Sequence, residues 1–173
     1  MSSYNKPKHT HKKNNLIIRR VRKGDEKSFL SLINALADYE KLKRPSYSAQ
    51  RRLIRDGFGK KKRFNGYLAF VENKAVGYAI TLETYSSFLA LPTLYLEDIF
   101  ILPEYRSHGI GRKMFKLCLS DAKKRGCGRM EWVVLDWNKP AIKFYDKIGA
   151  DHLKEWFTYR ISQKDFKNIL NNL

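Results

Sequence analysis

The chain has 173 residues, of which 43% are hydrophobic and 13% aromatic. This length suits one domain with a real core and is too short for two comfortable ones, and the apolar content excludes wholesale disorder. The formal net charge is +18, from 35 Lys and Arg against 17 Asp and Glu. Such an excess attracts nucleic acids, acidic membranes and phosphorylated cofactors alike, so charge alone selects no partner.

No apolar run approaches the roughly 20 residues that a membrane-spanning helix needs, and the first residues lack the apolar stretch of a signal peptide. We therefore expect a cytoplasmic protein without a membrane partner. Cys118 and Cys127 do not have a CxxC spacing, so the sequence predicts neither a disulfide framework nor a metal site. Residues 1–15 are predicted to be a basic flexible tail and residues 16–173 a single domain.

The first half of the domain predicts a strand, two helices and a hairpin. Residues 16–21, LIIRRV, have the composition of a strand. A helix should follow and end near Tyr39, because apolar residues recur at i, i+3, i+4 and i+7 from Phe29 to Leu36. Residues 46–57 look like a second helix. Residues 66–72 and 75–85 are rich in β-branched and aromatic side chains and predict a hairpin with its turn at Asn73 and Lys74.

The second half predicts alternating strands and helices. A loop at residues 86–93 should lead into a strand at 94–102, whose apolar run is interrupted by Glu97 and Asp98. The remaining expected elements are a helix at 109–124, a strand at 129–135, a helix at 140–148, a strand at 156–161 and a C-terminal helix. This order predicts a mixed α/β fold of α+β-like character, with a β-α-β unit around Gly109 that joins parallel strands.

The joint between the strand at 94–102 and the next helix has the sequence RSHGIG, residues 106–111. Small residues at a strand-to-helix joint leave the first free N–H groups of the helix accessible, and the helix dipole adds partial positive charge there. A phosphate can bind such a site, with Gly109 and Gly111 allowing close approach and Arg106 and Arg112 adding charge. Two spaced glycines can equally form a plain turn. The pattern is not a dinucleotide fingerprint, because no acidic residue closes a second βαβ unit.

About thirty residues further on, the segment DWNKPAIKFYDKIGA combines Asn138, a helix that Pro140 opens, and Tyr145. Together with RxxGxG, this segment resembles the GNAT acetyltransferase superfamily. The motifs LADYEK, DGFG, YLED and WNKPAIKFY are similar to its spermidine/spermine N-acetyltransferase branch. The resemblance covers nearly everything from Leu16 onward. It implies a central, mostly antiparallel sheet with a parallel strand pair splayed at a bulge, flanked by helices.

The resemblance also implies which residues contact the ligands. Acetyl-CoA is the implied cofactor, and a small-molecule amine is the implied substrate. The residues that would bind acetyl-CoA are the amides of Ile99, Phe100 and Ile101, the loop of Arg106, Ser107, His108, Gly109, Ile110, Gly111 and Arg112, and the opposite wall of Asn138, Ala141 and Tyr145. The residues that would meet the amine are Tyr39, Glu40, Glu97 and Asp98.

Acyl transfer to an amine needs a neutral amine, and an alkylammonium with a pKa near 10.4 is almost fully protonated at neutral pH. Glu97 is the candidate base, acting through water, because a carboxylate in an apolar strand is costly to bury without a cation, water or donor. Tyr145 is the candidate proton donor, and strand amides near Ile99 are candidate oxyanion stabilisers. Glu97 could instead form a structural ion pair, and Tyr145 could be core packing.

The substrate remains open at this stage. The branch carries an acidic residue and a tryptophan before the central strand, where this chain has Ser86, Ser87 and Phe88. A long polycation should therefore bind less well, and a diamine, a thialysine-like amino acid or a monoamine is a rival substrate. A protein or peptide N-acetyltransferase and a nucleic-acid-binding protein, suggested by the basic run 60–63, are the alternative functions. We expect nucleic-acid binding to be at most weak and non-specific. The resemblance further implies a homodimer.

Overall fold

The computed structural model describes residues 15–173, so the predicted basic tail lies almost wholly outside the described residues. The described residues divide into two compact units, which meet between Val133 and Val134 in the sequence and are described separately below. Within the described part, no helix has the length and apolar character that crossing a membrane requires. The single domain predicted over 16–173 stays a prediction.

The first unit is built on a five-stranded sheet with the strand order β1-β2-β3-β4-β5. The β4–β5 pair is parallel, and the other pairs are antiparallel. The sheet therefore confirms the predicted mixed α/β fold, including the parallel pair joined through a helix. The strands are β1 (Leu16–Arg20), β2 (Asn65–Val71), β3 (Lys74–Ser86), β4 (Leu91–Ile101) and β5 (Arg129–Glu131).

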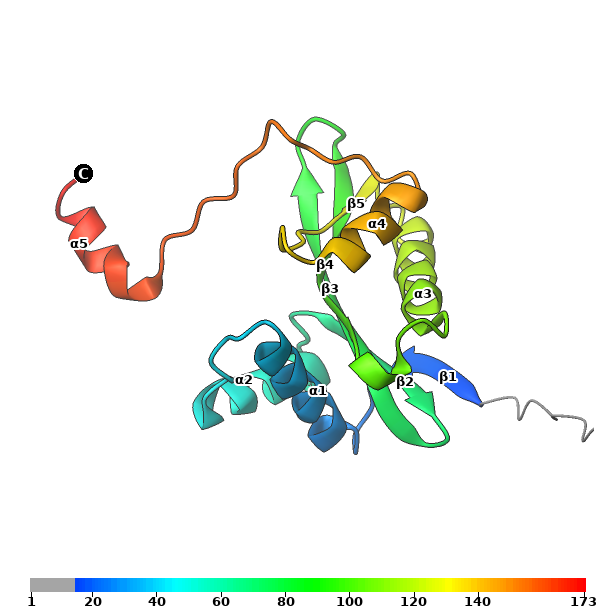
Figure 1. Cartoon of the computed structure of the whole chain (residues 1–173). Helices are drawn as coiled ribbons and strands as arrows, with labels where there is room; N and C mark the ends of the chain where they lie inside the picture. The colour runs from blue at the N-terminus through cyan, green and yellow to red at the C-terminus, as the bar shows by residue number, and fades with distance from the viewer. Residues whose placement is uncertain (1–14) are drawn as a thin grey trace, which may run out of the picture. The chain divides into compact units, whose positions relative to one another are not determined.

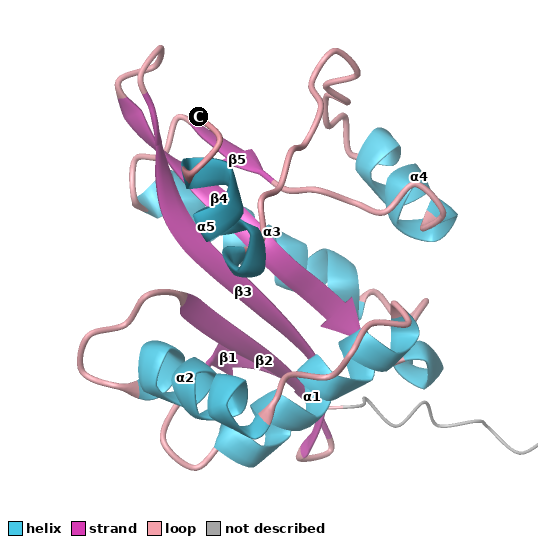
Figure 2. Ribbon diagram, turned by 90° about the vertical axis from the view of Figure 1, so that its left-hand side faces the viewer, coloured by secondary structure: helices cyan, strands magenta, loops and turns pink. Residues whose placement is uncertain are grey.

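Helices cover both faces of this sheet (Figures 1 and 2). Helices α1 (Glu26–Tyr39) and α2 (Tyr47–Phe58) lie on one side, and α3 (Ile110–Lys124) lies on the other. A short 3-10 turn, Pro103–Tyr105, separates β4 from α3. These three helices lie close to the predicted ranges, and the Ser46 hydroxyl caps α2 by accepting a hydrogen bond from Ala49 N–H.

The alternation of side chains along the strands creates two apolar layers. On the α1 face, Phe29 and Leu32 belong to one buried cluster with Leu68, Tyr78 and Phe100. The ring of Phe29 meets the ring of Tyr78 edge to face, with centroids 5.6 Å apart. On the α3 face, the buried side chains come chiefly from α3 and from the alternate strand positions; they include Tyr67, Ala69, Ala79, Met114, Phe115 and Cys118.

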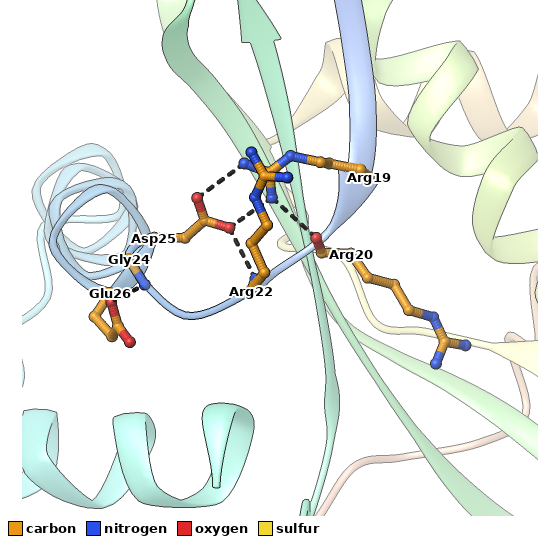
Figure 3. A network of polar contacts seen from close by, with 6 residues as sticks. All are labelled: Arg19, Arg20, Arg22, Gly24, Asp25 and Glu26. Carbon is orange, nitrogen blue, oxygen red and sulfur yellow. Dashed lines mark hydrogen bonds and ion pairs between the residues drawn. The ribbon is translucent and has the colours of Figure 1, made fainter.

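A buried carboxylate fixes the start of α1 against β1 (Figure 3). Asp25 accepts two hydrogen bonds from the Arg19 guanidinium, at 2.6 and 2.9 Å, and a third from the backbone N–H of Arg22 at 2.8 Å. The guanidinium carbon of Arg19 also lies 4.5 Å from the centroid of the Phe70 ring. The hydrogen bond to Arg19 lowers the pKa of Asp25. Asp25 therefore acts as a structural anchor between strand and helix.

The second unit contains helix α4 (Lys139–Lys147), the 3-10 turn Gln163–Asp165 and helix α5 (Phe166–Leu170). The prediction of a strand at residues 156–161 is wrong, because this segment has no strand partner in the described structure. Alternating side chains can favour an extended chain, but a strand forms only when a neighbouring strand supplies its hydrogen bonds. The predicted helix at 140–148 and the C-terminal helix are confirmed.

Three boundaries in the first unit also differ from the sequence prediction. The loop predicted at residues 86–93 is only half as long, because Ser86 pairs with Leu91 and the turn between β3 and β4 is confined to residues 87–90. The β2–β3 turn lies at Glu72 and Asn73, both with positive φ, one residue earlier than predicted. The strand predicted at 129–135 ends at Glu131, because β5 pairs only with Thr93–Tyr95 before β4 departs from it.

Candidate active site

A β-bulge lies in the middle of β4 at Glu97. Ile80 pairs with Asp98 and Thr81 pairs with Leu96, so Glu97 has no partner in β3. An extra residue of this kind bends its strand and increases the local twist. The parallel pairing with β5 ends two residues earlier, at Tyr95. The bulge and the parting of β4 from β5, which the family resemblance implied, are thus present in the fold.

Beyond the bulge, β4 presents an open edge that we call the β4 edge, residues 99–101. The N–H of Leu102 donates to Val76 O at 2.9 Å, so the backbone of Leu102 faces β3. In an antiparallel pair, successive residues turn their backbone groups alternately toward and away from the partner strand. The backbone groups of Ile99 and Ile101 therefore point away from β3. The backbone of Phe100 faces β3 instead. The predicted amide contacts of Ile99 and Ile101 therefore lie at this edge. That of Phe100 does not, and its ring is buried in the core.

The loop after β4 leads to an exposed helix start. Gly109 caps α3 with a left-handed backbone at φ +74°, and Ser107 also has positive φ. The first hydrogen bond of the helix runs from Lys113 N–H to Gly109 O, which leaves the N–H groups of residues 110–112 ahead of it. A Cβ built on Gly109 would meet nothing within 4 Å. The helix dipole and the space above it suit a phosphate.

The two predicted phosphate-binding arginines have different surroundings. Arg106 donates from Nε to the carbonyl of Ile101 at 2.9 Å, and its guanidinium carbon lies 4.3 Å from the ring centroid of Tyr39. This side chain therefore joins the β4 edge to the last residue of α1. Arg112 lies exposed in the first turn of α3, next to the free N–H groups, and His108 is exposed in the loop.

Three acidic side chains gather where α1 ends beside β4, and we call them the carboxylate cluster: Glu40, Glu97 and Asp98. Burial raises the pKa of Glu40. Burial and, to a smaller extent, the charges of Glu97 and Glu40 raise the pKa of Asp98 to about 6, against the opposing effect of a hydrogen bond from Tyr78. Within residues 15–173, no ion pair includes any of the three. In a chain of net charge +18, this cluster is a local concentration of negative charge.

Sequence reasoning missed one residue of this site, Tyr78. Its ring is fully buried, and its hydroxyl donates to Asp98 Oδ2 at 3.0 Å. Burial, followed by the charge of Asp98, raises the pKa of Tyr78, so its hydroxyl stays protonated. A buried tyrosine hydroxyl needs a polar partner, and that requirement was the available signal. The partner could not be identified because it depends on the strand register at the bulge.

The second unit carries the other predicted residues. Asn138 caps α4, and its side-chain oxygen accepts a hydrogen bond from Ala141 N–H at 3.4 Å. Tyr145 is half-buried and meets Phe144 edge to face, with centroids 5.5 Å apart. Burial raises the pKa of Tyr145, so its phenol is protonated at neutral pH. A protonated phenol can donate a proton but cannot accept one as a base.

Comparisons with known proteins agree with this geometry. A model of the acetyltransferase (GNAT) family matches residues 29–150. Thialysine N-epsilon-acetyltransferase of Sus scrofa is 33% identical over 165 residues, which cover 89% of this chain and 96% of that protein. The L-ornithine N5-acetyltransferase of Arabidopsis thaliana is 42% identical over 86 residues, which cover 50% of this chain and 38% of that protein.

The fold also matches solved structures. An aminoglycoside N-acetyltransferase in complex with CoA has a TM-score of 0.70 and 19% sequence identity, and the match covers 84% of this chain and 94% of that one. At this identity the likeness concerns the fold alone. This chain therefore shares its fold with other proteins. That fold contains the parallel pair of β4 and β5, which separates at the bulge, and the glycine-capped helix α3.

Proposed function

Because this chain belongs to the acetyltransferase (GNAT) family and is an N-acetyltransferase that uses acetyl-CoA, we propose that it acetylates a primary amine of a small molecule. The proposed substrate is a diamine, polyamine or lysine-like amine that carries a second cationic group. The observation that carries this proposal is the carboxylate cluster next to the β4 edge, without an ion pair among the described residues.

The residues around the start of α3 fit the diphosphate of acetyl-CoA. The space above Gly109 is open, the N–H groups of residues 110–112 precede the first helical hydrogen bond, and Arg112 supplies charge. The outward carbonyl of Ile99 and the outward N–H of Ile101 can pair with the amide-bearing arm of the same molecule. When bound, acetyl-CoA supplies an acetyl group activated as a thioester. In the second unit we assign cofactor binding to Asn138, Ala141 and Tyr145.

Glu97 is the proposed base. The bulge leaves it without a strand partner, and its side chain is exposed, so it can exchange protons with water. It would take the proton of the attacking amine through a water molecule. Tyr145 is the proposed acid, because burial keeps its phenol protonated until the departing thiolate needs a proton. The N–H of Ile99 would stabilise the negative charge that develops on the carbonyl oxygen.

The names of two relatives support the substrate class. One acts on thialysine and the other on L-ornithine, and each of these is an amino acid with a second amine in its side chain. Glu40 and Asp98 would hold the cationic group that does not react, and Tyr39 would line the same side. The serines and phenylalanine at positions 86–88 add no carboxylate for a longer polycation.

A screen of amines tests the proposal. Purified enzyme and acetyl-CoA would be mixed separately with L-ornithine, thialysine, putrescine, spermidine, butylamine and a peptide, and release of free CoA would be followed. We expect the first four to be acetylated faster than butylamine, because only they carry a second cation. Faster acetylation of the peptide would favour the alternative of a peptide N-acetyltransferase. Equal rates with butylamine and the diamines would contradict the role of the cluster.

A second candidate function rests on the basic surface of α2. Arg51, Arg52 and Arg55 are exposed on this helix, and the exposed run 60–63 adds four more cations. Phosphate backbones bind such surfaces with an affinity that falls steeply with salt. We expect weak binding of a random DNA duplex at 50 mM salt that is lost near 200 mM. Binding that persists at 200 mM salt would favour nucleic acid as a functional partner.

A further inference from the structure

Two buried tyrosines in neighbouring strands have the same local geometry and opposite electrostatic surroundings. Tyr67 in β2 donates its hydroxyl to Asp121 Oδ2 on the α3 face, and Tyr78 in β3 donates to Asp98 Oδ2 on the α1 face, both at 3.0 Å. Asp121 also forms ion pairs with Arg20 and Arg125, at 3.0 and 3.8 Å. The Tyr67 pair is therefore a neutralised structural contact.

Asp98 forms no ion pair with a cation among residues 15–173. The groups that act on its ionisation are Tyr78 in β3, Glu97 in the same strand and Glu40 at the end of α1. Burial and the two glutamates disfavour the carboxylate, whereas the hydroxyl of Tyr78 favours it. Among the described groups that shift the pKa of Asp98, only Tyr78 lowers it.

The position of the Tyr78 hydroxyl is fixed by packing. The Tyr78 ring is fully buried, and its centroid lies 5.6 Å from that of Phe29 and 6.3 Å from that of Phe100. A ring held on two sides gives the hydroxyl little freedom, and the hydrogen bond engages only Oδ2 of Asp98. The other carboxylate oxygen, Oδ1, has no hydrogen bond or ion pair to the described residues.

We propose that Tyr78 is a positioning residue that holds Asp98 as the acceptor for the second, unreactive ammonium group of a short diamine or diamino acid. This inference rests on the proposed function, in which Glu97 serves the amine that reacts. The reacting amine must lose its proton, but the second amine stays charged at neutral pH and matches a fixed carboxylate. Glu97 and Asp98 are adjacent in the chain, which favours a substrate with few methylene groups between its amines.

The test compares Tyr78→Phe with the matched control Tyr67→Phe. Each change removes one hydroxyl and leaves its ring in place, so both variants should fold, and thermal unfolding checks this. Without its donor, we expect the pKa of Asp98 to rise from about 6 by about one unit. The KM for L-ornithine should then rise about threefold at pH 6.5 and stay unchanged at pH 8.5, where Asp98 is ionised in either case. The KM for butylamine should not change in Tyr78→Phe.

The control variant should show the wild-type KM for L-ornithine at both pH values. Carbon-13 NMR of the Asp98 carboxyl group gives a readout besides activity, and its titration midpoint should rise in Tyr78→Phe only. An unchanged midpoint, or a KM change that is equal at both pH values, would overturn the proposal. If the wild-type enzyme acetylates no amine, the proposed function fails together with the substrate role of Asp98. If the wild-type enzyme is active but Tyr78→Phe keeps the wild-type KM for L-ornithine at both pH values, only the inference on Tyr78 is refuted and the proposed function stands.

Discussion

Glu97 and Asp98 are consecutive residues of β4, yet the fold gives them different surroundings. Glu97 is the bulged residue and is exposed, whereas Asp98 sits opposite Ile80 and receives the hydroxyl of Tyr78. In a regular strand the two side chains would point to opposite faces. The bulge instead brings both carboxylates close enough to Tyr78 for each charge to raise its pKa. The exposed Glu97 can thus exchange protons with water, while the neighbouring Asp98 is placed to accept a cation.

The raised pKa of Asp98 has a consequence for stability. Between about pH 4 and pH 6, the folded state binds this proton more tightly than the unfolded state, so the free energy of unfolding falls as the pH rises through this window. Asp98→Asn removes this cost. We expect the variant to be more stable than wild type by about 2 kcal/mol at pH 7.5 and equal to it near pH 4, as measured by urea unfolding. A difference that does not grow with pH would contradict the raised pKa.

Tyr145 offers a catalytic test with little structural risk. Tyr145→Phe removes only the hydroxyl, and the edge-to-face contact with Phe144 can remain. Loss of a general acid typically costs a factor of about 10² to 10⁴, so turnover should fall in this range while CoA affinity, measured by calorimetry, stays nearly unchanged. Full turnover in the variant with a good amine substrate would mean that Tyr145 is not the proton donor.

At the scale of elements, the sequence predicted what local patterns determine. Helix α1 follows from apolar periodicity, α2 lies within one residue of the predicted range 46–57, and α3 follows the glycines at 109 and 111. The length of β5 and the absence of a strand at 156–161 depend on which strands meet, and no local pattern contains that information. The same reason explains why Glu97 and Asp98 were identified and Tyr78 was not: the first two interrupt an apolar run, but the partner of Tyr78 is set by the β3–β4 register.

Asp25 anchors the start of α1, so replacing it should lower the stability of the fold. Asp25 is only 8% exposed and accepts three hydrogen bonds, so Asp25→Asn should lower the free energy of unfolding by about 2 kcal/mol at pH 7. The lowered pKa of Asp25 means that this contribution is present above pH 4 and is lost as the pH falls through its folded-state pKa.

The control for this anchor is the exposed pair of Asp38 and Arg44. Asp38→Asn removes a similar ion pair at the surface and should cost less stability than Asp25→Asn, because solvent screens an exposed pair. Both variants would be unfolded in urea at pH 7. Equal losses for the two would show that the burial of Asp25 does not matter.

Helix α3 provides its own matched pair for the cofactor site. Gly109 before the helix and Gly126 after it both have left-handed backbones, with φ of +74° and +69°, and both have open space at the Cβ position. Glutamate at either position bears similar backbone strain. Only Gly109→Glu places a negative charge at the free N–H groups, so it should abolish CoA binding in calorimetry. Gly126→Glu should keep wild-type affinity, and loss of binding in both variants would point to strain instead.

At the scale of the whole molecule, the net charge and the site have opposite signs. The chain carries +18, but the proposed amine site is built from three carboxylates. A cationic surface attracts the anionic cofactor and repels a polycationic substrate. The surface charge therefore favours the smaller of the amines considered, and raising the salt should lower KM for spermidine more than KM for butylamine.

The assembly of the molecule is the last property that can be tested. Trp156, Phe157 and Tyr159 are 76%, 80% and 90% exposed, and exposed aromatic side chains close together in the sequence are typical of interaction surfaces. We expect a homodimer with a mass near twice 20.4 kDa in light scattering. Trp156→Asp combined with Tyr159→Asp should shift the population to monomer, whereas Tyr85→Asp, at a similarly exposed tyrosine in β3, should not. A monomeric wild type would refute the dimer.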